Sequence, residues 1–257
     1  MTCFGVIGPG NLGEALLQKL SYSCEPWFYH RRLERCQELE RKNLGLSTSL
    51  DNILACRFVF ITVKPNAASQ LCREIKALAP KKYPLFISVM AGVPVSFLQE
   101  QLGTGRVCRV MFDLSIKYGT PIYIYSFCKD KEEKKEIAKV EDFLGMLVWF
   151  SDETKIDTVT ALFGCGPAFI SRFYQSYSKI ALESGIENAD VYLCRLFNTT
   201  AHMLAGESPD TIINKVACKG GATERGLQHL NNIDEALAAC IDVAEKRCHE
   251  LRDMFSL

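Results

Sequence analysis

A glycine-rich turn at positions 8–13, which read G-P-G-N-L-G, is the first segment of this chain that could bind a ligand. The turn follows the apolar run Phe4–Ile7 and precedes a helix-forming run at residues 14–20. In this context, the first glycine allows a tight turn, the second lets the backbone approach a pyrophosphate, and the third allows close packing of helix on sheet. Free N–H groups at the start of the helix attract phosphate oxygens. The residues expected to bind a dinucleotide are Gly8, Pro9, Gly10, Asn11 and Leu12.

The tip of the second predicted strand indicates which dinucleotide is bound. An acidic residue there accepts the ribose 2′-hydroxyl of NAD, whereas a basic residue accommodates the 2′-phosphate of NADP. The tip reads His30–Arg31–Arg32, with no acidic residue. Because a planar guanidinium suits a phosphate, Arg31 favours NADP, as NADPH, over NAD. The alternative is that Arg31 and Arg32 only begin a solvated helix.

Two further strand tips are expected at the same edge of the sheet. The apolar runs at 58–63 and 85–90 predict strands that end at residues 62–65, T-V-K-P, and at Ala91–Gly92. Ligands of an open α/β sheet bind beyond the carboxyl ends of its strands, so both tips should face the cofactor. Lys64 is either a cofactor contact or an exposed lysine at a strand end. The small side chains at 91 and 92 would leave room for the nicotinamide ribose.

A second glycine pair lies in the C-terminal half, where residues 216–224 read V-A-C-K-G-G-A-T-E. Two glycines directly before a helix form a concavity of backbone N–H groups that can hold a carboxylate. Thr223 is a candidate N-cap of that helix, and its hydroxyl could equally reach a bound ligand.

The order of the predicted elements indicates the fold. Short strands alternate with helices in the first half of the chain, which indicates βαβ units, and strand-like runs are absent from the second half. We expect an α/β Rossmann-type domain with a mostly parallel sheet at residues 1–152 and an all-α domain at residues 153–257. Strands are predicted at 3–8, 27–30, 58–63, 85–90, 107–111, 121–126 and 147–150, and helices at 11–20, 32–43, 66–79, 95–102, 130–144, 167–182, 188–205, 209–216 and 233–251.

The composition limits the expected partners and location. The 30 basic and 30 acidic side chains cancel, so no overall field favours nucleic acid or an anionic membrane. No apolar run approaches the roughly 20 residues that span a bilayer, and no basic leader precedes the first strand. The 12 cysteines and four histidines form no zinc pattern. We therefore expect a cytoplasmic protein without metal and with reduced cysteines, and an organelle matrix is the alternative location.

Four motifs give the chain a resemblance to the pyrroline-5-carboxylate reductases, enzymes that make proline from a cyclic imine. They are the glycine turn, T-V-K-P at 62–65, T-A-L-x-G-x-G-P-A-F at 160–169 and K-G-G-A-T at 219–223, in the order found in the family. The resemblance implies a helical domain that interlocks two subunits. It also implies a homodimer that can form larger homo-oligomers, with a substrate site near the dimer interface.

The resemblance also implies a reaction and roles for single residues. NADPH would reduce 1-pyrroline-5-carboxylate to L-proline, and because a protonated imine is already a good electrophile, catalysis needs positioning above all. The residues that would hold the carboxylate of the imine are Gly220, Gly221, Ala222 and Thr223, with Thr223 the catalytic residue whose hydroxyl binds the ring nitrogen. The residues that would contact the cofactor, besides the turn and Arg31, are Ser49, Val63, Lys64, Pro65 and Ala91.

One segment departs from the family pattern R-V-M-x-N-x-P. Residues 109–115 read R-V-M-F-D-L-S, without the asparagine or the second proline. In the family this loop lies near the nicotinamide, where Asp113 would bring a negative charge and Phe112 bulk. Cys218 also replaces the usual serine. Three hypotheses follow: an active reductase of the proline pathway, a related NADP-dependent oxidoreductase for another small carboxylate, and a catalytically weak regulatory protein that binds the nucleotide.

Overall fold

The computed structural model describes residues 3–118 and 123–255, and its contacts divide the chain into two compact units. The first unit runs to Cys165 and includes the chain from Val243 onward, and the second is Gly166–Asp242. These units are defined by contacts, and the domain boundary predicted after residue 152 stays a prediction. The first two residues of the predicted strand 121–126 lie outside the described residues.

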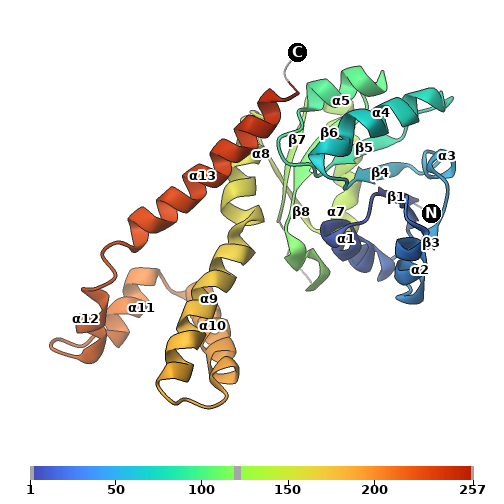
Figure 1. Cartoon of the computed structure of the whole chain (residues 1–257). Helices are drawn as coiled ribbons and strands as arrows, with labels where there is room; N and C mark the ends of the chain where they lie inside the picture. Colours follow the sequence, from blue (N-terminus) through green and yellow to red (C-terminus); the bar gives the residue numbers. More distant parts are fainter. Residues whose placement is uncertain (1–2, 119–122, 256–257) are drawn as a thin grey trace. The chain divides into compact units, whose positions relative to one another are not determined.

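The first unit is built on a sheet with the strand order β3-β2-β1-β4-β5-β6-β7-β8 (Figure 1). All neighbouring strands are parallel except β6 and β7, which are antiparallel. The strand order reverses between β1 and β4, and this crevice is where open α/β sheets bind ligands. The expected α/β class with a mostly parallel sheet is thus confirmed. The strands are β1 Phe4–Ile7, β2 Trp27–Tyr29, β3 Leu46–Ser47, β4 Phe58–Ile61, β5 Leu85–Ser88, β6 Val107–Met111, β7 Tyr123–Cys128 and β8 Met146–Trp149.

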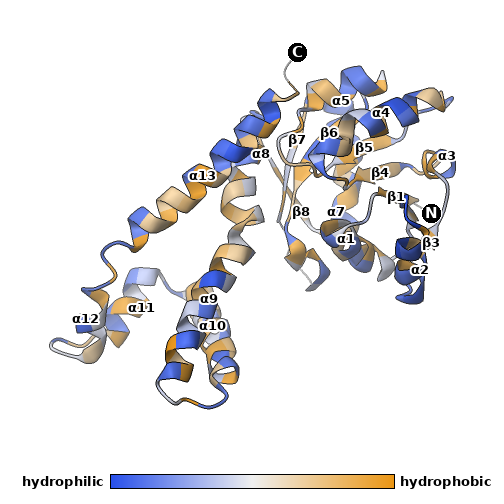
Figure 2. Ribbon diagram, in the orientation of Figure 1, coloured by the Kyte–Doolittle hydropathy of each residue, from blue (hydrophilic) through white to orange (hydrophobic). Residues whose placement is uncertain are grey.

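Helices cover both faces of this sheet, which explains why its central strands are apolar along their whole length. Figure 2 shows this contrast between the hydrophobic strands and the hydrophilic outer surface of α2. One hydrophobic cluster joins the sheet to α1, α2 and α7, and a second joins it to α3, α4, α5 and α8. The elements are α1 Asn11–Ser21, α2 Leu33–Arg41, α3 Leu50–Ile53, η1 Pro65–Ala67, α4 Ala68–Ala77, α5 Val95–Leu102, η2 Leu114–Tyr118, α6 Lys131–Ile137, η3 Ala138–Val140, α7 Glu141–Leu144, α8 Thr154–Val159 and η4 Thr160–Gly164.

Two parts of the first unit differ from the sequence prediction. The predicted helix 130–144 is divided into α6, a 3-10 turn and α7, which lets Ile137, Val140 and Leu144 all enter the core. Strand β3 and helix α3 were not predicted. Both are short, and Ser49 begins α3 as its N-cap by accepting a hydrogen bond from the backbone N–H of Asn52.

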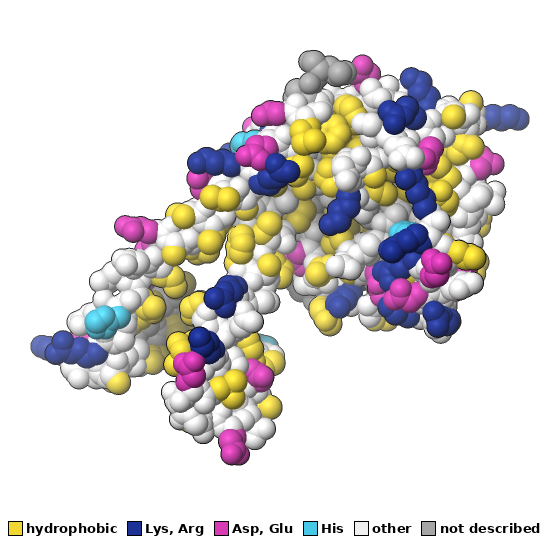
Figure 3. Space-filling model, in the orientation of Figure 1, with side chains coloured by type: hydrophobic (Ala, Val, Ile, Leu, Met, Phe, Trp, Pro, Cys, Tyr) yellow, Lys and Arg dark blue, Asp and Glu magenta, His cyan; other side chains and the backbone are white. Residues whose placement is uncertain are grey.

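The second unit consists of helices whose apolar side chains are largely exposed within this single chain. In α9 and α10, Ile170 is 60% exposed and Val191 66% exposed, and Figure 3 shows hydrophobic side chains at the surface of this unit. Tyr174 links the two helices by donating to the carbonyl of Asp190 at 2.8 Å. The helices are α9 Gly166–Glu183, α10 Ala189–Gly206, α11 Pro209–Val216, α12 Ala222–Leu227 and α13 Ile233–Asp253, the last of which ends in the first unit.

None of the helices within the described ranges combines the length and the hydropathy needed to cross a membrane. The same ranges contain no group of three or more His, Cys, Asp or Glu side chains placed to hold a metal ion.

A buried ion cluster ties β6 to the last helices of the first unit. Arg109 of β6 is 1% exposed, and its Nη2 lies 2.5 Å from Oδ1 of Asp157, which is fully buried. Arg252 of α13 pairs with the other oxygen of Asp157, and Glu153 lies 3.4 Å from Nη1 of Arg109. The carboxylate of Asp157 therefore contacts both guanidinium groups, and Glu153 adds a second carboxylate beside Arg109. Arg109 Nε has no hydrogen-bond partner among the described residues.

We expect Asp157→Asn to destabilise the first unit strongly, because it leaves buried positive charge without its main partner. Breaking a buried pair in this way costs about 3–5 kcal/mol, measured as the change in free energy of unfolding in urea. The exposed Glu132→Gln, which removes an ion pair with Lys135, is the matched control and should leave stability unchanged. Equal effects of the two substitutions would contradict this account of the cluster.

Candidate cofactor site

The glycine turn connects β1 to α1 and leaves open space in front of the helix. Gly8 has a φ of +75°, a left-handed conformation that favours glycine. Gly10 is the N-cap of α1 and provides no side-chain cap, so the first N–H groups of the helix are not capped by that residue. A Cβ added at Gly10 would meet no atom within 4 Å. These features fit a phosphate group placed against the start of α1.

Thr62, directly after β4, seats this turn on the sheet. Its hydroxyl lies 3.0 Å from the carbonyl oxygens of both Ile7 and Gly8. A Cβ at Gly13 would lie 2.5 Å from the same hydroxyl oxygen, so only glycine lets α1 approach so closely. The proposed packing role of Gly13 therefore has a physical basis. The motif T-V-K-P contained Thr62, but no feature of the sequence indicated that its hydroxyl binds the turn.

Arg35 of α2 supports the turn from the other side and was missed in the sequence. Its Nε donates to the carbonyl oxygen of Pro9 at 3.3 Å, and its Nη1 lies 2.7 Å from Glu38. Arg35 also pairs with Glu14 of α1, which Lys42 contacts at 2.8 Å. Although partial burial acts in the opposite direction, the hydrogen bonds from Lys42 and Arg35 hold the pKa of Glu14 below its usual value.

Arg31 stands after β2, where the 2′-phosphate prediction requires a basic residue, and is engaged by helix α4. Its Nη2 lies 2.8 Å from Oε1 of Glu74, and its Nη1 donates to Gln70 at 3.3 Å. The side chains of Arg31 and Glu74 are 47% and 34% exposed, so the pair is screened by solvent. Next to it, Nδ1 of His30 accepts the backbone N–H of Arg32, and burial lowers the pKa of His30.

The other predicted contacts lie after neighbouring parallel strands, and the structure brings their backbone to one edge of the sheet. Val63, Lys64 and Pro65 follow β4, and Ala91 follows β5. The interpretation of Gly92 was wrong. A Cβ there would lie 2.5 Å from the Cβ of Leu251 in α13, so Gly92 makes room for that helix rather than for a nicotinamide ribose.

The segment that departs from the family pattern packs against α1, the helix that follows the glycine turn. Phe112 is only 3% exposed and, with Ile116, belongs to the hydrophobic cluster that contains residues of α1. The bulk of Phe112 therefore enters the core, contrary to the expected intrusion near the nicotinamide. Asp113 Oδ1 accepts the backbone N–H of Ser115 at 2.6 Å, which fixes the turn that leads into η2.

The K-G-G-A-T loop belongs to the second unit and precedes α12. The N-cap of α12 is Gly221 and Thr223 lies in the first turn of the helix, so of the two roles considered for Thr223 the N-cap is wrong. Gly220 has a φ of +75°, and its N–H donates to Oε2 of Glu224 at 2.7 Å. The backbone here thus binds one carboxylate oxygen of this chain.

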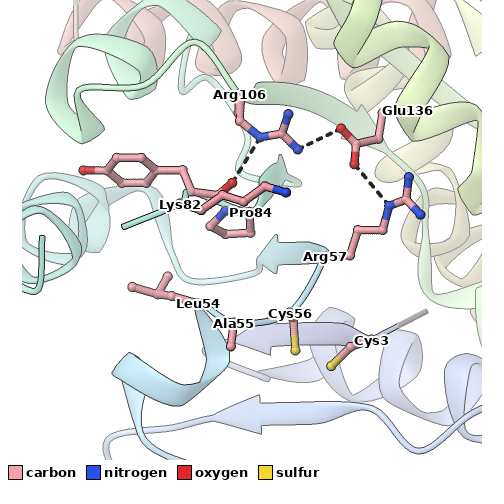
Figure 4. Close-up of a pocket in the computed structure, with 10 residues that line it drawn as sticks. Cys3, Leu54, Ala55, Cys56, Arg57, Lys82, Pro84, Arg106 and Glu136 are labelled. Atoms are coloured by element: carbon pink, nitrogen blue, oxygen red, sulfur yellow. Dashed lines mark hydrogen bonds and ion pairs between the residues drawn. The ribbon is translucent and has the colours of Figure 1, made fainter. Parts of the chain in front are cut away.

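A cavity of about 480 Å³ lies at the opposite edge of the sheet. Residues that precede β4, β5 and β6 line it, and Glu136 joins two of them, Arg57 at 3.1 Å and Arg106 at 2.7 Å (Figure 4). Because ligands of open α/β sheets bind beyond the carboxyl ends of the strands, this cavity at the amino ends is separate from the candidate cofactor site.

Comparison with known proteins identifies both parts of the chain. Residues 153–251 match the model for pyrroline-5-carboxylate reductase dimerisation, and residues 3–92 match the model described as NADP oxidoreductase, coenzyme F420-dependent. Pyrroline-5-carboxylate reductases from Staphylococcus aureus and Staphylococcus saprophyticus are each 26% identical to the chain. The alignments cover 96% and 95% of this chain and 97% and 96% of those proteins.

Two solved structures of pyrroline carboxylate reductases have the same fold as this chain. The pyrroline-5-carboxylate reductase of Coxiella burnetii has a TM-score of 0.78 at 23% identity, over 96% of this chain and 97% of that one. The Plasmodium falciparum enzyme, solved with NADP bound, has a TM-score of 0.83 at 19% identity, over 98% of both chains. The chain therefore combines a domain that matches the NADP-oxidoreductase model with one that matches pyrroline-5-carboxylate reductase dimerisation, and it is similar to these reductases over nearly its whole length.

Proposed function

We propose that the protein reduces 1-pyrroline-5-carboxylate to L-proline with NADPH. The observation that carries this proposal is the combination, in one chain, of an uncapped glycine turn at the carboxyl edge of the sheet and the K-G-G-A-T loop of the helical unit. The first suits a dinucleotide and the second a small carboxylate. Relatives of that name align over nearly the full length of the chain.

The proposed cofactor contacts are distributed over the carboxyl edge of the sheet. The turn and the first N–H groups of α1 bind the pyrophosphate, and Arg31 binds the 2′-phosphate after exchanging its contact with Glu74. Lys64 makes no ion pair with any described residue and adds positive charge at this edge. When bound, NADPH supplies the hydride. The proposed cofactor contacts are Gly8, Pro9, Gly10, Asn11, Leu12, Arg31, Ser49, Val63, Lys64, Pro65 and Ala91.

The proposed substrate contacts come from the second unit. The contact between Gly220 N–H and Glu224 supports a carboxylate partner for this loop, and the carboxylate of the imine would replace Glu224 there. Gly221 and Ala222 contribute further backbone N–H groups, and the hydroxyl of Thr223 binds the ring nitrogen. The exposed apolar faces of α9 and α10 favour burial against a second copy, so we propose a homodimer. The cytoplasmic location stays a prediction.

The proposed reaction needs no general acid or base from the protein. The substrate nitrogen carries its proton before reaction, so hydride addition at the adjacent carbon gives the neutral amine without a proton from a side chain. What the chain supplies is orientation: backbone N–H groups hold the carboxylate, and Thr223 fixes the ring nitrogen. Correct orientation of this kind contributes up to about 7–11 kcal/mol to barrier lowering in well-aligned reactions.

A related NADPH-dependent reduction of another small imino acid is the second candidate. It is favoured by Asp113, because a charged side chain stands at the position where the family pattern has asparagine. Phe112 of the same loop gives it no support, because its side chain is buried in the core.

The direct test of the proposal is an assay of purified protein with NADPH and 1-pyrroline-5-carboxylate, followed at the absorbance of the reduced nicotinamide. We expect NADPH consumption with formation of proline, and at least a tenfold loss of kcat in Thr223→Val. Larger cyclic imino acids serve as comparison substrates. Absence of turnover in a preparation that binds NADPH would refute the proposed activity and would favour a regulatory nucleotide-binding protein.

A second test concerns the choice between NADPH and NADH. Arg31→Asp should raise the Kd for NADPH by roughly tenfold or more, because a charge-assisted bond to the 2′-phosphate is lost, with a much smaller effect on NADH. Glu74→Gln should lower the Kd for NADPH by about two- to fivefold, since it removes an exposed competing carboxylate, and should leave NADH binding unchanged. Equal effects of Arg31→Asp on both cofactors would rule out a 2′-phosphate role.

A further inference from the structure

Two cysteines face each other across the antiparallel pair of strands in the sheet. Cys108 of β6 and Cys128 of β7 are direct partners in the register. Their sulfur atoms lie 3.0 Å apart, with the thiol of Cys108 donating to Cys128. Cross-strand partners have neighbouring Cβ atoms on the same face of a sheet, so the register itself holds the two thiols together. No role in the proposed reduction uses either of them.

The two thiols differ in access and in acidity. Cys108 is completely buried, whereas Cys128 is partly exposed at the end of β7. The hydrogen bond from Cys108 lowers the pKa of the Cys128 thiol. The same hydrogen bond, together with burial, raises the pKa of Cys108. Because a thiolate is the nucleophile in disulfide exchange, Cys128 is the thiol suited to react first.

We propose that Cys108 and Cys128 form a redox-active dithiol that low-molecular-weight disulfides such as glutathione disulfide convert into a cross-strand disulfide. The Cys128 thiolate attacks one sulfur of glutathione disulfide, whose S–S bond breaks, and one glutathione thiolate leaves. Cys108 then loses its proton and attacks the Cys128 sulfur of this mixed disulfide, and the second glutathione leaves. Two protein thiols are oxidised by two electrons, and one glutathione disulfide is reduced to two molecules of glutathione.

The consequence of closure is a covalent link between the parallel part of the sheet and its antiparallel edge. Cys108 precedes Arg109, the centre of the buried ion cluster, on the same strand. A link between β6 and β7 shortens the freely moving chain of the unfolded state. Oxidation should therefore raise the midpoint of thermal unfolding without requiring a change of the strand register.

A second pair offers a matched control. Cys3 and Cys56 precede β1 and β4, and their sulfur atoms lie side by side at the rim of the cavity (Figure 4). Burial raises the pKa of Cys56, and Cys56 is 2% exposed. The substitution Cys3→Ser removes this pair and leaves Cys108 and Cys128 unchanged.

The experiment treats the reduced, folded full-length protein with glutathione disulfide, traps remaining thiols and maps disulfides by mass spectrometry of peptides. We expect a peptide cross-linked between residues 108 and 128 in the wild type and in Cys3→Ser. We expect a glutathione adduct that persists on Cys128 in Cys108→Ser, and a Cys108 that stays free in Cys128→Ser. Dithiothreitol should reverse the cross-link together with the rise in unfolding midpoint.

A sample of the reduced protein unfolded in urea, in which every cysteine is accessible, shows that the reagent is active. The proposal is overturned if the reagent modifies the unfolded sample while Cys108 and Cys128 both remain free in the folded wild type. It is also overturned if Cys108→Ser carries no adduct on Cys128. Since the mapping uses the wild type and Cys3→Ser as well, poor folding of one strand variant does not decide the outcome.

Discussion

The fold of the candidate cofactor site depends on how the turn between β1 and α1 is held against the end of β4. The Thr62 hydroxyl bonds to the carbonyl oxygens at the end of β1, and Gly13 allows α1 to approach that hydroxyl. Arg35 fixes the carbonyl of Pro9 from α2. These contacts orient α1 so that its first N–H groups face outward at the crevice where the strand order reverses. A phosphate then meets a site whose backbone is already ordered.

The sequence predicted the parts of this arrangement that depend on local pattern. Apolar runs bounded by turns gave the central strands, and the spacing of Gly8, Gly10 and Gly13 gave the dinucleotide turn, because each requirement acts on a few consecutive residues. Contacts between segments far apart in the chain were not predictable in this way. Nothing in the local sequence shows that Arg35 reaches Pro9 or that Glu74 engages Arg31.

Long-range packing also accounts for the interpretations that were wrong. Gly92 looked like space for a ligand, but the space is filled by the end of α13, more than a hundred residues later in the chain. Phe112 looked like an obstacle near the cofactor, but its side chain lies in the core beside α1. The loop at residues 112–115 thus differs from the family pattern in sequence, while its largest side chain, Phe112, packs beside α1 at the candidate cofactor site.

Amide hydrogen exchange with and without saturating NADPH can show whether NADPH binds at the turn on the carboxyl edge of the sheet. We expect slower exchange in residues 8–16 and 62–66, with no change in residues 54–57 and 82–84, which line the cavity at the opposite edge. Slower exchange confined to the cavity residues, or no change at the turn under saturating NADPH, would contradict binding at the turn.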